Sequence, residues 1–243
     1  MTIREITAKV DEYLKSSEYK DSAIKSIGAA FSPGRKNFFQ KTQNFLRGRY
    51  YLIRALFSSC ILPSEDLQSI VNYLLPDIDI RDTRIPFMAV TTDLITGKQV
   101  VLTEGSLRDA VLASSSVPGA VEPTRMGEWL LADGGVTSLV PVNAARQAGA
   151  DVVIAVDISG GIVRTVPDGM MESMKKSVDI MYSRIAEYQI KNADVVIRPN
   201  MKNIGSTEME KFNEAILEGE KSATLKLPEL QNIMERLKRE GRI

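Results

Sequence analysis

The residues with the clearest chemical potential are at the corner Asp133-Gly134-Gly135. Residues 129–132 before it, Trp-Leu-Leu-Ala, predict a short buried strand that ends at the aspartate. Ligands usually bind at the carboxyl ends of strands in open α/β sheets, and glycines allow a sharp turn and a close approach to a neighbour. Asp133 is therefore a candidate functional residue. On spacing alone, the commoner case is an Asp-Gly turn whose carboxylate accepts a hydrogen bond from its own loop.

The count of histidines narrows the chemistry, because the 243 residues contain none. A Ser-His-Asp triad, a Cys-His dyad and an imidazole zinc site are excluded within the chain. Any general base must be a carboxylate, a lysine or a tyrosine. Cys60 is the only cysteine, so neither an intramolecular disulfide nor a thiolate metal cluster can form.

No serine stands in the pattern of a nucleophile elbow, G-x-S-x-G. The nearest string is Ala-Phe-Ser-Pro-Gly around Ser32. There the residue after the serine is Pro33, which has no N–H to donate to an oxyanion. Ser114, Ser115 and Ser116 end a predicted short helix and are interpreted as hydroxyls that cap a turn before Pro118. The sequence therefore yields no nucleophile.

The sequence gives little support for a phosphate-binding loop or a metal site. Gly160-Gly161 after Ser159 lacks the lysine and the spacing of a P-loop. Asp93, Asp133 and Asp157 all end predicted strands, which leaves a Mg²⁺ site open as an alternative, but no carboxylate cluster has metal-site spacing. We predict no metal and no organic cofactor. Lys and Arg number 31 and Asp and Glu 31, so no net field attracts nucleic acid.

The elements that must position Asp133 begin after a helical region, residues 1–84. Amphipathic spacing predicts helices over 2–18 and 37–58, and Ser64 as N-cap of a helix to Leu75. An α/β core then spans 85–200, and C-terminal helices span 201–243. No linker or repeat interrupts the chain, which predicts a single domain of the α/β class.

Strands and helices alternate within the predicted core. The segments expected in chain order are a strand 87–92, a hairpin partner 99–102, a helix 106–113, a strand 129–132, a helix 141–148, a strand 151–157, a helix 170–191 and a strand 193–198. The continuous apolar run 151–157 is typical of a parallel sheet covered on both faces. Residues 206–240 predict two helices broken at Pro228.

Four linked segments resemble the patatin-like phospholipase family over about residues 85–160. Residues 91–97 are similar to the family's T-D-L-x-T-G turn, and residues 105–119 to its G-S-L-x-x-A-x-x-A-S-x-x-x-P-G segment. The Asp133-Gly134-Gly135 corner followed by Pro141-Val142 resembles its D-G-G/A motif and helix start, and residues 149–157 its next strand. Ser138-Leu139 stands where many members have Asn then Pro.

The resemblance implies a three-layer α/β/α sandwich and hydrolysis of a phospholipid or other fatty-acyl ester by a Ser-Asp dyad without cofactors. Asp133 would be the dyad's base, and Gly134 and Gly135 would shape its loop. The family places the nucleophile elbow and oxyanion loop upstream of the matched segments. We therefore expect a natural protein with roughly 60–80 further residues upstream, the length of two βα units.

Two alternatives to that expectation remain. The chain could be a non-catalytic remnant that acts as a binding or scaffold protein through its helices at 2–80 and 206–240, or a separate polypeptide could supply the serine. If the elbow strands are absent, the sheet is incomplete and exposes strand edges and apolar faces.

The sequence predicts a cytoplasmic location, because it begins without an apolar signal region and contains no run of membrane-spanning length. Peripheral contact with a membrane is a weaker prediction, and core packing of the same residues is its alternative. It rests on the aromatic and basic stretch 35–58, with Phe38, Phe39, Arg47, Arg49, Tyr50 and Tyr51.

Overall fold

The computed structural model describes residues 2–17, 19, 64–159, 161–162, 165–201, 204 and 208–242. The predicted helix 37–58, the aromatic and basic stretch 35–58 and Ser32 lie outside these residues. The chain forms two compact units, 1–137 with 206–210 and 138–205 with 211–243. Each unit is described by itself, and the single domain stays a prediction.

The helices of the first unit are α1 (Ile3–Lys15), α5 (Ser64–Leu74) and α6 (Leu107–Ser114), all in predicted helical segments. Two of them, α1 and α6, begin at polar N-caps, and the third, α5, has Ser64 as its first helical residue. Thr2 and Glu5 form a reciprocal capping box on α1, and Ser106 accepts a hydrogen bond from the Asp109 backbone N–H at the start of α6. Helix α5 contacts both α1 and α6.

The sheet of the first unit is antiparallel throughout. Its strands are β1 (Ala89–Asp93), β2 (Gln99–Leu102), β3 (Thr124–Met126) and β4 (Trp129–Asp133), in the spatial order β2-β1-β4-β3. The predicted hairpin of β1 and β2 is confirmed. β3 was not predicted, because its sequence Thr-Arg-Met is short and polar. The register places Thr91 opposite Asp133.

Helix α6 packs on β1 and β4 and buries the apolar side of the sheet. Leu131, Ala110 and Ala113 are each at most 1% exposed at this contact. The buried cluster comprises Ile80, Ala89, Leu102, Leu107, Ala110, Ala113 and Leu131. Asp133 therefore ends a strand whose inner residues are fixed by close packing.

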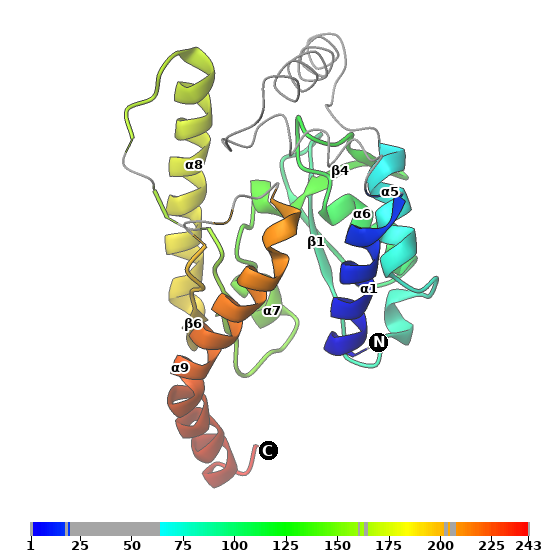
Figure 1. Ribbon diagram of the computed structural model, residues 1–243. Coiled ribbons are helices and arrows are strands. Elements are labelled where there is room, and N and C mark those ends of the chain that lie inside the picture. The colour runs from blue at the N-terminus through cyan, green and yellow to red at the C-terminus, as the bar shows by residue number, and fades with distance from the viewer. Residues whose placement is uncertain are drawn as a thin grey trace. The chain divides into compact units, whose positions relative to one another are not determined.

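The second unit contains a βαβ arrangement. Its elements are α7 (Val142–Gln147), β5 (Ile154–Val156), α8 (Met170–Gln189), β6 (Val195–Ile197) and α9 (Phe212–Arg239). β5 and β6 pair in parallel, as the sequence predicted for the 151–157 strand. The connection between them runs through α8, the long yellow helix of Figure 1. The core cluster is Val140, Val142, Val153, Ala155 and Ala186.

The prediction that the 151–157 strand is covered on both faces is wrong. Ala155 is buried against the core that α7 and α8 complete, whereas Ile154 and Val156 are 48% and 54% exposed. Alternate residues of a strand point to opposite faces, so among the described residues of this unit only the face of Ala155 is packed.

The predicted break at Pro228 is also wrong, because α9 continues through it as one helix. A proline removes one backbone hydrogen bond and crowds the preceding turn, which kinks or breaks many helices. Here good helix formers such as Leu225, Lys226, Glu229 and Leu230 flank it on both sides, and the remaining bonds hold the helix together. The α/β class itself is confirmed by the mixture of helices and open sheets.

Candidate functional site

Asp133 is the last residue of β4 and the N-cap of the 3₁₀ turn η2 (Gly134–Val136). Its backbone N–H donates to the Ser116 carbonyl at 2.9 Å, and its Oδ1 accepts from the Gly135 N–H at 2.6 Å. The Asp-Gly turn read from the spacing is thus present. Oδ2 accepts no hydrogen bond from the described residues, so one carboxylate oxygen is available to take a proton.

Gly134 fits against the backbone of β1, where no side chain could. A Cβ at this position would lie 2.3 Å from the Val90 carbonyl oxygen, well inside contact distance. The predicted close approach of the glycine corner is confirmed at Gly134. A second tie is the hydrogen bond between the hydroxyls of Thr92 and Thr137, 2.9 Å apart, which joins β1 to the end of the turn.

Burial raises the pKa of the Asp133 carboxyl, and the hydrogen bond from Gly135 opposes that rise only in part. The side chain is half-buried, and no described cation pairs with it. A carboxylate with a raised pKa is a better proton acceptor than an ordinary surface aspartate. The corner can therefore hold a base in a fixed orientation.

The serines near this corner have structural partners. The Ser114 hydroxyl donates to the Val90 carbonyl at 2.8 Å, and the Ser116 hydroxyl donates to the Leu112 carbonyl at 2.8 Å. Ser115 is the C-cap residue of α6, and Ser116 is fully buried. These contacts support the interpretation of the three serines as capping and packing residues.

Asp93 organises a turn instead of facing Asp133. Its carboxylate accepts from the Thr96 hydroxyl at 2.6 Å and from the backbone N–H groups of Ile95, Thr96 and Leu130. The pKa of Asp93 is lowered, chiefly by the Thr96 hydroxyl. Because β1 and β4 are antiparallel, Asp93 and Asp133 lie at opposite ends of the pair. Within the described residues, no three acidic, histidine or cysteine side chains gather as a metal site would require.

Asp157 follows β5 and is only 7% exposed. Its Oδ1 accepts from the Ser159 N–H at 3.1 Å, and its Oδ2 accepts from Arg198 Nε at 3.1 Å. Burial alone would raise the pKa of Asp157, but the hydrogen bonds from Ser159 and Arg198 outweigh it, and the pKa lies below its usual value. Asp157 is therefore held as a charged partner of Arg198.

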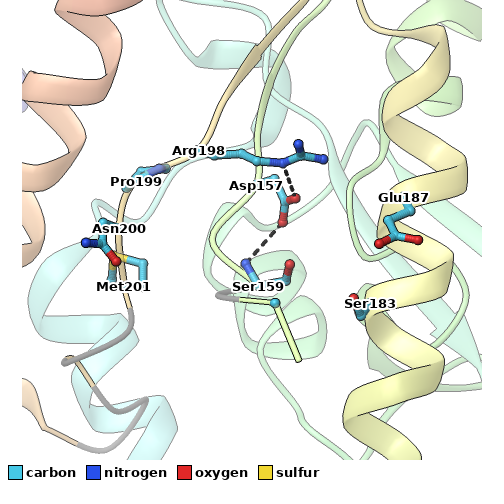
Figure 2. Close-up of a pocket in the computed structure, with 9 residues that line it drawn as sticks. Asp157, Ser159, Ser183, Glu187, Arg198, Pro199, Asn200 and Met201 are labelled. Carbon is cyan, nitrogen blue, oxygen red and sulfur yellow. Dashed lines mark hydrogen bonds and ion pairs between the residues drawn. The ribbon is translucent and has the colours of Figure 1, made fainter. Parts of the chain in front are cut away.

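A polar pocket of about 300 Å³ opens beside this pair (Figure 2). Ser183 and Glu187 line it from α8, and Arg198 lines it from the end of β6. The full lining is Asp157, Ser159, Gly161, Ser183, Glu187, Arg198, Pro199, Asn200 and Met201. The sequence signalled only that Asp157 ends a strand. Arg198, Ser183 and Glu187 were missed, although an arginine directly after the last apolar run was a usable clue.

The fold and the first site define an α/β protein with a fixed, half-buried aspartate at a strand-end glycine turn. Residues 11–146 match the model of the family described as patatin-like phospholipase, more than half of the chain. The chain belongs to the patatin-like phospholipase family. The match includes Asp133 and begins well upstream of the motifs from which the resemblance was inferred. It ends before Asp157 and the polar pocket.

The chain is similar to proteins whose names refer to the NTE family or to a patatin-like phospholipase domain. One uncharacterised NTE family protein of Mycobacterium tuberculosis is 33% identical over 138 residues, 55% of this chain and 38% of that protein. Another from the same organism is 26% identical over 162 residues, 56% of this chain and 28% of that protein. The mouse patatin-like phospholipase domain-containing protein 7 is 36% identical over 110 residues, 44% of this chain and 8% of that protein. The matched regions thus span less than two-fifths of these relatives' length.

One structural finding bears on whether the chain could span a membrane. None of the helices that the structure describes combines the length and the apolar character needed to cross a bilayer. The cytoplasmic location and the peripheral contact through residues 35–58 stay predictions.

Proposed function

We propose that the protein is a lipid acyl hydrolase that cleaves a carboxylic ester of a fatty acid, with Asp133 as the base of a Ser-Asp dyad. The observation that carries the proposal is the state of Asp133: oriented by Gly135, half-buried, with a raised pKa and a free Oδ2 among the described residues. Its position inside the family match adds support. A direct carboxylate base also suits a chain without histidine.

The proposed reaction has two steps. The carboxylate of Asp133 takes the proton of a serine hydroxyl as the serine oxygen bonds to the ester carbonyl carbon. The carbon–oxygen bond to the alcohol then breaks, and the alcohol leaves with that proton. Water repeats the sequence on the acyl-serine, releases the fatty acid and restores the serine. Gly134 keeps the aspartate against β1 during both steps.

The test uses the natural protein from its source cells, beside an Asp133→Asn variant of the same protein. Asparagine keeps the size of the side chain and an oxygen for the Gly135 N–H, but it cannot take a proton. We expect hydrolysis of a fluorogenic phospholipid to fall by roughly 10²–10⁴-fold, the usual contribution of a general base. Hydrolysis that persists in a folded Asp133→Asn protein overturns the assignment.

A fluorophosphonate label on the natural protein identifies the other half of the dyad. The labelled peptide, sequenced by mass spectrometry, would contain a serine in a G-x-S-x-G string. We propose that this serine lies in a segment of the same protein outside the 243 residues. The alternative is that a separate polypeptide supplies it. The intact mass of the labelled species distinguishes these sources.

One observation favours a second candidate, a non-catalytic binding protein. The amino-terminal half of α8 exposes several apolar side chains, of which Met170 is 74% and Met174 is 59% exposed. Exposed apolar surfaces of this kind mark interaction sites in many proteins. A natural protein that is well folded, yet neither labels with fluorophosphonate nor hydrolyses phospholipid, would favour this candidate.

A further inference from the structure

The polar pocket lies where the fold of the second unit leaves room for a ligand. Asp157 directly follows β5 and Arg198 directly follows β6, so both stand at the carboxyl ends of neighbouring parallel strands. The loops leaving such ends commonly form a binding crevice. Because β5 and β6 pair in register, Asp157 and Arg198 are brought side by side.

Arg198 has the geometry of an oxyanion anchor. Asp157 binds only its Nε, and within the described part of the chain Nη1 and Nη2 donate to no acceptor. These two nitrogens lie on the side of the pocket toward α8 (Figure 2). A guanidinium fork matches the two oxygens of a phosphate or carboxylate, and an aspartate on Nε holds it still. Asp157 is thus a positioning residue.

Ser183 supplies a second donor. It is 8% exposed, lines the pocket, and its hydroxyl has no hydrogen-bond partner among the described residues. The other serines of α8 behave differently. Ser173 and Ser177 donate to the carbonyls of Gly169 and Ser173, one turn back, at 2.9 Å each. Because Ser183 lines the pocket, its hydroxyl can donate a hydrogen bond to a ligand atom there.

Glu187 sets the charge that the pocket accepts. It follows Ser183 by one turn on α8, and its Oε2 is paired with Arg184 on the helix surface at 2.9 Å. Asp157 balances Arg198, and Arg184 balances Glu187, so these four side chains carry no net charge. A dianion would therefore give this neutral set of side chains a net negative charge. A ligand with one negative and one positive group meets a partner for each.

From these contacts we infer that the pocket binds a small zwitterion that carries an oxyanion and an ammonium group. Arg198 and Ser183 hold the oxyanion, and Glu187 faces the ammonium. The volume of about 300 Å³ is large enough for a molecule of amino-alcohol phosphate size. The site is independent of Asp133 and of the proposed hydrolysis.

Isothermal titration calorimetry on the full 243-residue chain tests the inference with three probes: phosphoethanolamine, inorganic phosphate and ethanolamine. The titrations are done at about pH 5, where a phosphate monoester carries mainly one negative charge because its second pKa is about 6. We expect phosphoethanolamine to bind more tightly than either half. Arg198→Gln should weaken it about tenfold or more, because a charge-assisted pair is lost. Glu187→Gln should weaken phosphoethanolamine but leave phosphate within about twofold. Equal affinity of phosphoethanolamine and phosphate overturns the zwitterion.

Two further variants separate binding from folding. Ser183→Ala removes one hydroxyl without touching the Asp157–Arg198 pair, and should weaken phosphoethanolamine by about threefold to tenfold. Arg236→Gln changes an exposed arginine of α9 that does not line the pocket, and should leave binding unchanged. Unchanged affinity in both Ser183→Ala and Arg198→Gln contradicts the site.

The last arm distinguishes a lipid head group from a free metabolite. Vesicles of phosphatidylcholine with and without phosphatidylethanolamine are sedimented with the protein. Binding that requires phosphatidylethanolamine and is lost in Arg198→Gln assigns the site to a head group, whereas binding of soluble phosphoethanolamine alone assigns it to a metabolite. The Asp133→Asn variant should bind normally, so failed hydrolysis and failed binding are separate results.

Discussion

Asp133 and Asp157 adopt the same local motif in two different units. Asp133 is the last residue of β4, and Asp157 directly follows β5. Each accepts a hydrogen bond through Oδ1 from the backbone N–H two residues later, at 2.6 Å and 3.1 Å. Yet the pKa of Asp133 is raised, by burial, whereas the pKa of Asp157 is lowered. The neighbouring strand makes the difference: β6 delivers Arg198 to Asp157, while β1 brings the uncharged backbone of Val90 against Gly134.

This contrast separates orientation from charge. The turn motif orients a carboxylate in both places, but it does not decide which protonation state the protein favours. At Asp157 a fixed cation keeps the carboxylate charged, so its use is to hold that cation. At Asp133 no described cation does so, and the group is free to gain and lose a proton. The same motif can therefore serve a binding site or a base.

The largest effect we expect comes from removing the close approach that seats the Asp133 turn. Gly134→Ala places a Cβ 2.3 Å from a backbone oxygen of β1, so the turn or the strand must shift. We expect the first unit to lose about 3 kcal/mol of unfolding free energy, in the range of overpacked sites. Urea unfolding followed by the fluorescence of Trp129, the only tryptophan, measures it.

Gly219→Ala is the matched control for that substitution. Gly219 lies inside α9 with nothing within 4 Å of a built Cβ. Alanine there should stabilise its helix by about 0.5–1 kcal/mol, because glycine is a poor helix former. If Gly134→Ala is as well tolerated as Gly219→Ala, the turn does not depend on close contact with β1.

A smaller loss is expected when Asp157 is neutralised. Asp157→Asn breaks a partly buried charged pair, and at pH 7 should cost the second unit about 1–3 kcal/mol. The folded pKa of Asp157 is lowered, so its stabilisation is present above the unfolded pKa and is lost as the pH falls through the folded value. The deficit should therefore persist at pH 5 and shrink only below about pH 3.8.

Hydrogen exchange followed by mass spectrometry tests that prediction locally, by measuring the protection of backbone amides in peptides that span β5 and β6. The first unit serves as the internal control, since its peptides should keep wild-type protection in Asp157→Asn. Equal protection of the β5 and β6 peptides at pH 7 would show that the pair with Arg198 contributes nothing to this unit.

The sequence predicted Asp133 better than it predicted the pocket, and the reason is the range of the interactions. The Asp133 corner is encoded locally, by an apolar run, an aspartate and two glycines. The pocket depends on the pairing of Val156 with Ile197, which brings Asp157 beside Arg198 across 41 positions of sequence. Neither apolar run alone shows which strand it will pair with, and no local pattern shows that Ser183 of α8 lines the same pocket.

The fold shows the same division between local and long-range information. The hairpin of β1 and β2 was predicted because its two apolar runs flank a Thr-Gly turn. The uncovered face of β5 was not, because an apolar run does not reveal which of its faces a helix will cover. The predicted break at Pro228 was wrong for a related reason. A proline destabilises a helix locally, but whether the helix continues depends on the other residues of α9.

The smallest effect on the free energy of unfolding should come from Asp133→Asn. The sign of this effect is opposite to that expected for Asp157→Asn. A raised folded pKa means that this carboxyl favours the folded state while protonated, and that contribution is lost as the pH rises through the folded pKa. At pH 7 the uncharged asparagine, which still accepts from Gly135, should leave stability equal or higher by less than about 1 kcal/mol. The difference should vanish below about pH 3.8. Trp129 fluorescence in urea measures it, and a clear loss of stability at pH 7 would mean that an unrecognised partner holds the Asp133 charge, which would make the two aspartates alike.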